Sequence, residues 1–278
     1  MAWGLGWMER FTVEILTVGN ELLIGKICNT NAQWLAQRIT RLGGKVTRII
    51  TVPDSLPDIS QTVRECLSRK PDFLLTVGGL GPTFDDMTLQ GVGEAVGRPL
   101  KVNSEALRMV EEKVREYSEK GVLKRPLVTP EREKMATLPE GSKPLFNPEG
   151  TAPGVELSVG ETTIICLPGV PIEMKAIFSL HVEKLMAARS KLKYAEGSLL
   201  VLGIPEPDFS PTIDEAMRRY PGVYVKSHPK GGEATSTIEL HLSAFAESLE
   251  EAERMVRDAA SWLEAEAKRL GGRVEKPG

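Results

Sequence analysis

The chain is poor in cysteine and in aromatic residues, and each scarcity narrows the classes of protein to which it can belong. Its 278 residues include three cysteines, and Cys28, Cys66 and Cys166 form no C-x-x-C pair. We therefore expect free thiols in a reducing compartment rather than a disulfide framework. Aromatic residues make up 5% of the chain and the net charge is −3, so neither a stacking platform for single strands nor a basic nucleic-acid surface is expected.

Long apolar runs are also missing. No stretch approaches the roughly 18 apolar residues that a membrane span requires. Residues 1–10 have neither the apolar segment nor the cleavage site of a secretory signal. We expect a cytoplasmic protein without membrane contact, in which residues 1–11 form an N-terminal extension. Met8 lies shortly before the first predicted strand, so either Met1 or Met8 could be the true start.

Residues 12–190 alternate between short apolar runs and amphipathic segments. The predicted strands are residues 13–18, 46–52, 73–77, 156–159 and 162–167, and the predicted helices are residues 30–42, 56–68, 87–96, 104–120 and 171–188. Such alternation implies an α/β fold with a mostly parallel sheet and right-handed crossovers. Six prolines punctuate residues 124–154, which we therefore predict to be mostly loop.

The pattern changes after residue 191. The predicted strands there are residues 198–204, 223–227 and 237–243, and the predicted helices are residues 211–220 and 248–270. Ser248 and Glu251 have the spacing of a capping box in front of the last helix. The order β-α-β-β-α indicates a small α+β domain over residues 197–278, which follows a first domain of residues 12–190.

The most informative motif is GGLGPTFDD at residues 78–86, between a predicted buried strand and a predicted helix. Glycines at such a turn let backbone N–H groups approach an anion closely. Adjacent carboxylates would repel a bare phosphate, but they fit a divalent cation held between them and phosphate oxygens. We predict a metal-assisted phosphate or pyrophosphate site at the carboxyl edge of the sheet. The alternative is an ordinary first helical turn, whose acids complement the helix dipole.

Four further segments follow predicted strands or lie beside them: residues 19–26, 52–54, 147–154 and 167–174. Ligands bind at the carboxyl edge of such sheets, so each segment is a candidate part of the site. Residues 19–26 are not a Walker A loop, because five residues separate the glycines and Ile27 follows the lysine. Each segment also allows a structural interpretation, as a turn or, for Asp54, as a helix N-cap.

Together these motifs resemble the N-terminal domain of the CinA family (competence/damage-inducible protein), which has the molybdopterin-binding fold of MogA, MoaB and MoeA. The matching segments are residues 19–25, 29–31, 52–54, 78–88, 125–126, 147–154 and 167–174. They recur in the family's order, and the resemblance covers about residues 12–270. Asn20 stands where the family often has an aspartate. The resemblance implies a three-layer α/β sandwich followed by a KH-like α+β domain, without the deamidase domain of larger CinA proteins.

The resemblance also implies a function. It implies an enzyme that hydrolyses a nucleotide-sugar pyrophosphate, ADP-ribose to AMP and ribose 5-phosphate, with Mg²⁺ or another divalent cation and with K⁺ as an accessory ion. The alternative is a molybdopterin-binding protein or molybdopterin adenylyltransferase of molybdenum cofactor synthesis, and a module that binds without turnover is a third hypothesis. The expected partners are a small nucleotide substrate and a second copy of the chain, in a homodimer that the KH-like unit supports. RNA binding is not expected, because no G-x-x-G clamp loop lies between the right elements.

The resemblance and the strand-end motifs together provide the candidate site residues. Asp54 and Asp86 match the two acidic positions regarded as essential in the molybdopterin branch, and we predict that they are catalytic. Asp85, Asp86 and Glu21 are the predicted Mg²⁺ ligands. The predicted substrate and phosphate contacts are Gly19, Glu21, Gly78, Gly79, Gly81, Thr83, Lys134, Asn147, Gly150, Thr151, Pro168 and Gly169.

Overall fold

A computed structural model describes residues 10–123, 127–230 and 236–275 of the chain. They form two compact units, of which the larger spans residues 11–189 apart from residues 41–43. Of the described residues, the smaller contains Arg10, residues 41–43 and those from Ser190 onward. Most of the predicted N-terminal extension, residues 1–9, lies outside the described residues. No helix in the described ranges is long and apolar enough to cross a membrane.

The larger unit is built on a six-stranded sheet with the order β2-β1-β3-β8-β7-β6. The strands are β1 (Thr12–Val18), β2 (Lys45–Val52), β3 (Phe73–Val77), β6 (Lys143–Leu145), β7 (Gly154–Val159) and β8 (Thr162–Leu167). The four strands β2, β1, β3 and β8 run parallel, whereas β7 and β6 pair antiparallel. The predicted mostly parallel sheet is therefore confirmed, and the parallel strands bring their carboxyl ends to one edge.

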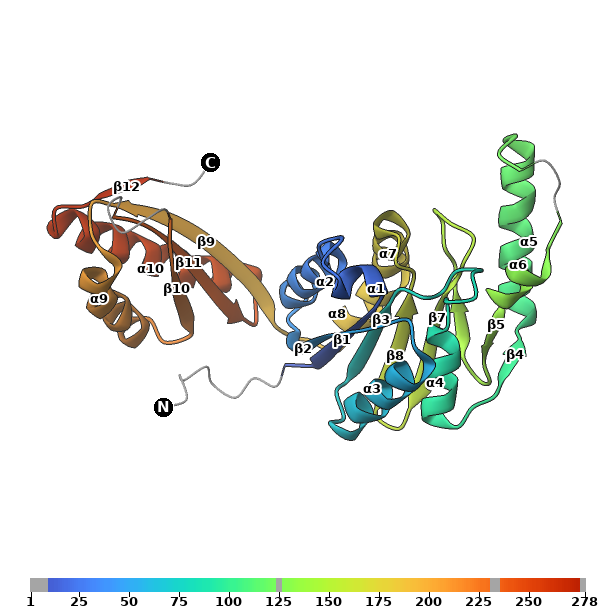
Figure 1. Cartoon of the computed structure of the whole chain (residues 1–278). Helices are drawn as coiled ribbons and strands as arrows, with labels where there is room; N and C mark the ends of the chain where they lie inside the picture. Colours follow the sequence, from blue (N-terminus) through green and yellow to red (C-terminus); the bar gives the residue numbers. More distant parts are fainter. Residues whose placement is uncertain (1–9, 124–126, 231–235, 276–278) are drawn as a thin grey trace. The chain divides into compact units, whose positions relative to one another are not determined.

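Helices cover both faces of this sheet (Figure 1). The helices α3 (Leu56–Ser68), α4 (Thr88–Val96) and α5 (Ser104–Glu119) pack with one apolar cluster, and α2 (Thr30–Arg41), α7 (Pro171–Ile177) and α8 (Glu183–Ala187) lie on the other face. A π-helical turn, Phe178–Val182, joins α7 to α8. Its Phe178 packs edge-to-face on Trp34 of α2, with ring centroids 5.5 Å apart. The predicted three-layer sandwich is confirmed.

The segment that we predicted to be mostly loop contains ordered elements. They are α6 (Pro130–Lys134), β5 (Thr137–Pro139) and β6, and residues 124–126 lie outside the described ranges. The strand β5 pairs antiparallel with β4 (Leu100–Val102), far back in the chain. The proline content of the segment predicted a loop. The strand was missed because its pairing partner is remote in the sequence. The Asn103 side chain caps α5 by accepting the amides of Glu105 and Ala106 at 3.0 Å each.

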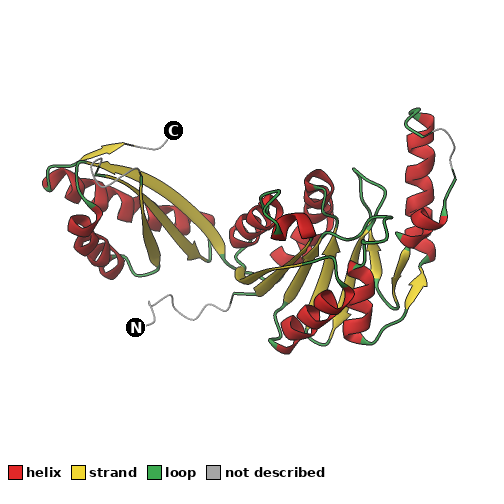
Figure 2. Cartoon of the chain, viewed as in Figure 1, coloured by secondary structure: helices red, strands yellow, loops and turns green. Residues whose placement is uncertain are grey.

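The smaller unit has a four-stranded sheet with helices packed on it, as Figure 2 shows. Its elements are β9 (Lys193–Leu202), α9 (Glu206–Arg219), β10 (Val223–Pro229), β11 (Thr237–Ala246), α10 (Leu249–Arg269) and β12 (Arg273–Glu275). The predicted β-α-β-β-α order is confirmed, and β12 adds a short strand beside β9. The helix α9 begins before Pro211, which lies inside it. The Ser248 hydroxyl caps α10 by accepting the Glu251 amide at 3.1 Å, as predicted.

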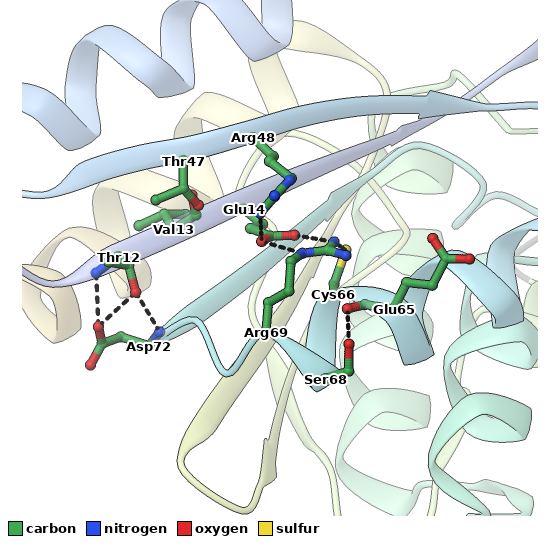
Figure 3. A network of polar contacts seen from close by, with 10 residues as sticks. All are labelled: Thr12, Val13, Glu14, Thr47, Arg48, Glu65, Cys66, Ser68, Arg69 and Asp72. Carbon is green, nitrogen blue, oxygen red and sulfur yellow. Dashed lines mark hydrogen bonds and ion pairs between the residues drawn. The ribbon is translucent and has the colours of Figure 1, made fainter.

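A buried ion pair joins β1 to the loop after α3 in the larger unit (Figure 3). The Glu14 side chain is 2% exposed and accepts two hydrogen bonds from Arg69, at 2.8 and 2.6 Å. Burial opposes ionisation of Glu14, but the bonds from Arg69 and from Cys66 leave its pKa below the usual range. Burial and the neighbouring carboxylate raise the pKa of the Cys66 thiol to about 12. The pair therefore ties β1 to the segment between α3 and β3.

Candidate functional site

A cleft of 620 Å³ opens at the carboxyl edge of the sheet in the larger unit. Turns that follow β1, β2, β3 and β8 contribute to it, together with the first residues of α2 and α7. The predicted site residues that line it are Glu21, Asp54, Gly78, Gly79, Gly81, Thr83, Asp85, Asp86, Thr151, Pro168 and Gly169. Segments from distant parts of the sequence thus meet where the parallel strands end.

The glycine turn after β3 provides hydrogen-bond donors to the cleft. Gly78 and Gly79 have φ values of 102° and 67°, which favour glycine strongly. The Gly78 amide donates to the Leu167 carbonyl of the neighbouring strand at 3.0 Å, so it is used by the sheet. Within the part of the chain that the structure describes, the amides of residues 79–81 donate to no partner. This run of unused N–H groups is suited to an anion such as a phosphate.

Thr83, Asp85 and Asp86 form an anionic corner of the cleft. The Thr83 hydroxyl lies 2.5 Å from Asp85 Oδ1 and 2.5 Å from Asp86 Oδ2, and its amide donates to Asp86 at 2.8 Å. The hydrogen bond from Thr83 holds the pKa of Asp85 below its ordinary value, and the nearby Lys134 adds to the shift. Gly81 is required here, because a Cβ on it would lie 2.6 Å from the Asp86 carboxylate.

This corner fits a divalent cation only in part. Across the described ranges, no three side chains of histidine, cysteine, aspartate or glutamate come close enough to hold a metal ion. The Glu21 carboxylate does not lie with those of Asp85 and Asp86 in this structure: it folds back toward Gly19, where a Cβ would meet it at 2.7 Å. Mg²⁺ often takes one or two carboxylates and completes its shell with substrate phosphates. The two aspartates fit an ion that arrives with a phosphorylated ligand.

Asp54 follows β2 and lines the cleft. Its Oδ2 accepts the Asn20 amide at 2.8 Å, at the start of the short helix α1 (Asn20–Leu23). Asp54 thus ties the turn after β1 to the turn after β2, while its side chain still lines the cleft. Gly19 does not line the cleft, and its N–H donates to the Val52 carbonyl at 3.1 Å.

Asn147 and Gly150, predicted as ligand contacts, lie behind the cleft wall and position Glu173. Asn147 is 2% exposed, and its Oδ1 accepts the amides of Glu149 and Gly150 at 3.0 and 2.9 Å. Its Nδ2 donates to the Ala152 carbonyl at 2.8 Å and to Glu173 Oε2 at 2.7 Å. A Cβ on Gly150 would lie 2.1 Å from that same oxygen. The asparagine motif is therefore a support for Glu173, which does line the cleft.

We expect Asn147→Ala to lower the free energy of unfolding by about 2–3 kcal/mol, because buried amides and carbonyls lose their partner. Urea denaturation at pH 7 measures this change. The exposed Glu149→Ala change in the same turn is the control and should cost little. An unchanged urea midpoint in the Asn147 variant would show that its buried hydrogen bonds do not stabilise the loop.

Lys134, predicted to contact a phosphate, is engaged elsewhere. Its Nζ donates to the Thr83 carbonyl, so it holds the glycine turn instead of facing the main cleft, and it lines a smaller hollow of 320 Å³. Arg132, on the same short helix, lines the main cleft and supplies the cationic side chain there. Arg132 was not predicted, because without the helical geometry of α6 the sequence could not show which of its basic side chains lines the cleft.

Asn31 and Glu173 also line the cleft, although neither was among the predicted site residues. Both belong to segments of the resemblance, residues 29–31 and 167–174. Asn29 caps α2 by accepting the Ala32 amide at 3.1 Å, so a second asparagine at Asn31 exceeds what the cap requires. This excess was the available signal that Asn31 belongs to the cleft.

Comparisons with known proteins cover the part of the chain that forms the cleft. The profile of a family described as a probable molybdopterin binding domain matches residues 14–188, which include every residue that lines the cleft. A protein of Pyrobaculum calidifontis is 48% identical over 251 residues, 90% of this chain and 92% of its own. A protein of Metallosphaera sedula is 40% identical over 267 residues, 96% of this chain and 98% of its own. The crystal structure of CinA from Thermoplasma acidophilum superposes with a TM-score of 0.57 at 39% identity, over 63% of this chain and 98% of that chain.

Proposed function

Because this chain belongs to the family of probable molybdopterin binding domains and its fold is CinA-like, we propose that its cleft binds a phosphorylated pterin of the molybdopterin type. The CinA resemblance inferred from the sequence is confirmed for the larger unit, whereas the KH-like assignment of the smaller unit stays a prediction. The run of unused amides at residues 79–81 is the observation that carries the proposal.

The ligand phosphate would lie on the amides of residues 79–81, at the amino end of α4. Backbone donors and the helix dipole both favour an anion at that place. Arg132 lines the same cleft and adds a positive charge. The apolar side chains of Leu22, Ile27 and Met135 also line the cleft and suit a flat heterocycle.

The reaction that this arrangement supports is adenylyl transfer to the bound pterin phosphate. A phosphate oxygen of the pterin would attack the α-phosphorus of ATP, and the bond to the leaving pyrophosphate would break. Asp85 and Asp86 would hold a Mg²⁺ ion that neutralises charge on the phosphates. The amides of residues 79–81 would hold the attacking phosphate in place. Their contribution to catalysis would be the orientation of this phosphate toward ATP.

Hydrolysis of ADP-ribose, the main expectation from the sequence, is not supported by these comparisons. The matching profile describes a molybdopterin binding domain, and the two candidate reactions would use the same aspartates. Adenylyl transfer therefore replaces hydrolysis as the proposed reaction, and the hydrolysis of ADP-ribose becomes one outcome of the test.

We expect the purified protein to bind 6-hydroxymethylpterin phosphate and, with ATP and MgCl₂, to release pyrophosphate and an adenylylated pterin. Calorimetry measures the binding, and chromatography resolves the products. A parallel incubation with ADP-ribose and MgCl₂ tests for AMP and ribose 5-phosphate. Asp86→Asn is the control that assigns any turnover to the anionic corner.

The outcomes separate three functions. Pterin binding with adenylylated product supports the full proposal, whereas binding without product supports a binding module. Release of AMP from ADP-ribose, with no pterin binding at millimolar concentration, would overturn the proposal in favour of the pyrophosphatase.

A further inference from the structure

We propose that Glu173 and Asn31 form a pair of hydrogen-bond acceptors that recognises the 2-amino-4-oxopyrimidine edge of the ligand ring. This inference rests on the proposed function and names the part of the ligand that the cleft selects. Neither residue contacts the glycine turn or the aspartates through a hydrogen bond, so the assignment concerns ring recognition and not phosphate chemistry.

Glu173 is held so that part of its carboxylate stays available to a ligand. Its Oε2 accepts from Asn147 Nδ2, and Gly150 packs directly against the carboxylate. Its Oε1 accepts no hydrogen bond from the described part of the chain, although the side chain lines the cleft. The buried asparagine therefore fixes one oxygen and leaves the other for a donor from the ligand.

Asn31, in the first turn of α2, offers the second acceptor. Its Nδ2 donates to the Gly169 carbonyl at 2.7 Å, which fixes the amide plane and assigns Oδ1 as the remaining acceptor. Asn31 Oδ1 is buried and has no hydrogen-bond partner within the described ranges. A buried acceptor without a partner costs free energy. A hydrogen bond from a ligand N–H to this oxygen would therefore contribute more binding free energy than a hydrogen bond to an exposed acceptor.

The two acceptors belong to one region of the cleft. Asn31 lies in the first turn of α2 and Glu173 in the first turn of α7, and the bond from Asn31 to Gly169 connects these two helix starts. Both helices cover the same face of the sheet (Figure 1). The anionic corner belongs to the turn before α4, which covers the other face. The cleft thus has an acceptor wall for a ring and a separate donor turn for a phosphate.

An acceptor wall selects for a particular ring edge. A 2-amino-4-oxopyrimidine presents its 2-amino group and the adjacent ring N–H, which are neighbouring donors. A 2,4-dioxopyrimidine presents a carbonyl at position 2, which would face the carboxylate with no proton between the two oxygens. Burial raises the pKa of Glu173, and the negative charge of Glu149 raises it further, whereas the hydrogen bond from Asn147 lowers it. A donor edge on the ligand would also stabilise the ionised carboxylate.

The test compares 6-hydroxymethylpterin phosphate with the matching lumazine phosphate, in which an oxo group replaces the 2-amino group. We expect wild-type protein to bind the pterin about 10-fold to 100-fold more tightly, the range of one to two lost hydrogen bonds. In Glu173→Gln the new amide can accept from Asn147 with its oxygen and present NH₂ to the cleft. That variant should lose the preference or invert it, and Glu149→Gln, outside the cleft, should keep it.

A second variant keeps the proposal testable if Glu173→Gln does not fold. Gly150→Ala would place a methyl group 2.1 Å from Oε2 and push the flexible carboxylate aside without removing its charge. It should also reduce the pterin-to-lumazine preference, and inorganic pyrophosphate, which has no ring, should bind at least as tightly to each variant as to wild type. Equal preference in wild type and in both variants would overturn the ring assignment and leave the proposed function standing. Absence of binding of either pteridine to wild type would overturn the proposed function itself.

Discussion

Replacing Arg69 with methionine is expected to lower the free energy of unfolding by about 3 kcal/mol, because removal of one partner of a buried ion pair leaves a buried charge unpaired. Glu14 is 2% exposed and receives both of the shorter hydrogen bonds from Arg69 (Figure 3). Urea denaturation at pH 7 measures the change. Arg48→Met is the matched control: Arg48 is 53% exposed and reaches Glu14 at 3.3 Å, so its loss should cost about 0–1 kcal/mol.

The effect of Arg69→Met should depend on pH. In the wild type the pKa of Glu14 is lowered on folding, so its stabilising contribution is present above the unfolded value of about 4.3 and is lost as the pH falls through the folded value. Without Arg69, burial dominates and the carboxyl takes up a proton more readily. The difference in stability between wild type and variant should therefore be largest near neutral pH and narrow below about pH 4. A difference that widened on acidification would contradict the assignment of the Glu14 charge.

Gly79→Ala is expected to weaken the binding of a phosphorylated pterin by about 10-fold to 100-fold, the range expected when a hydrogen bond to a charged phosphate is lost. Gly79 has a φ of 67°, and a Cβ on it would lie 2.3 Å from Thr88 Oγ1. Thr88 is fully buried, and its hydroxyl donates to the Gly78 carbonyl at 2.8 Å, so it cannot move aside. The turn itself would shift and misdirect its amides. Calorimetry with 6-hydroxymethylpterin phosphate measures the loss.

Gly97→Ala separates backbone strain from loss of the anion site. Gly97 ends α4 with a φ of 66°, and no atom lies within 4 Å of a Cβ built on it. Both variants carry the strain of a left-handed alanine, on the order of 1 kcal/mol, but only Gly79→Ala alters the cleft. If both variants lost affinity equally, the amides of the glycine turn would not be the phosphate site.

Sequence periodicity predicted the elements that depend on local pattern. The helix over Leu56–Ser68 and the strands Phe73–Val77 and Thr162–Leu167 begin and end as predicted. The spacing of their apolar residues indicates which face of each helix or strand is buried. In an alternating β/α chain these faces are buried by packing helices on both sides of the sheet. The same pattern placed the glycine turn and its aspartates at the carboxyl edge, because parallel strands end together there. The β4–β5 pairing was missed, since its hydrogen bonds join segments that are far apart in the chain.

By itself, the sequence determined the α/β architecture and the set of polar residues at the strand ends. Only the tertiary structure decided what several of those residues do. Asn147 looked like a ligand contact, yet folding buries it and turns its amide toward Glu173. Lys134 is committed to the Thr83 carbonyl, and Asn31 is left with a buried acceptor. The physical reason is that the hydrogen-bond partners and the burial of a side chain depend on which distant segments come into contact. The local spacing of residues in the sequence does not specify those contacts.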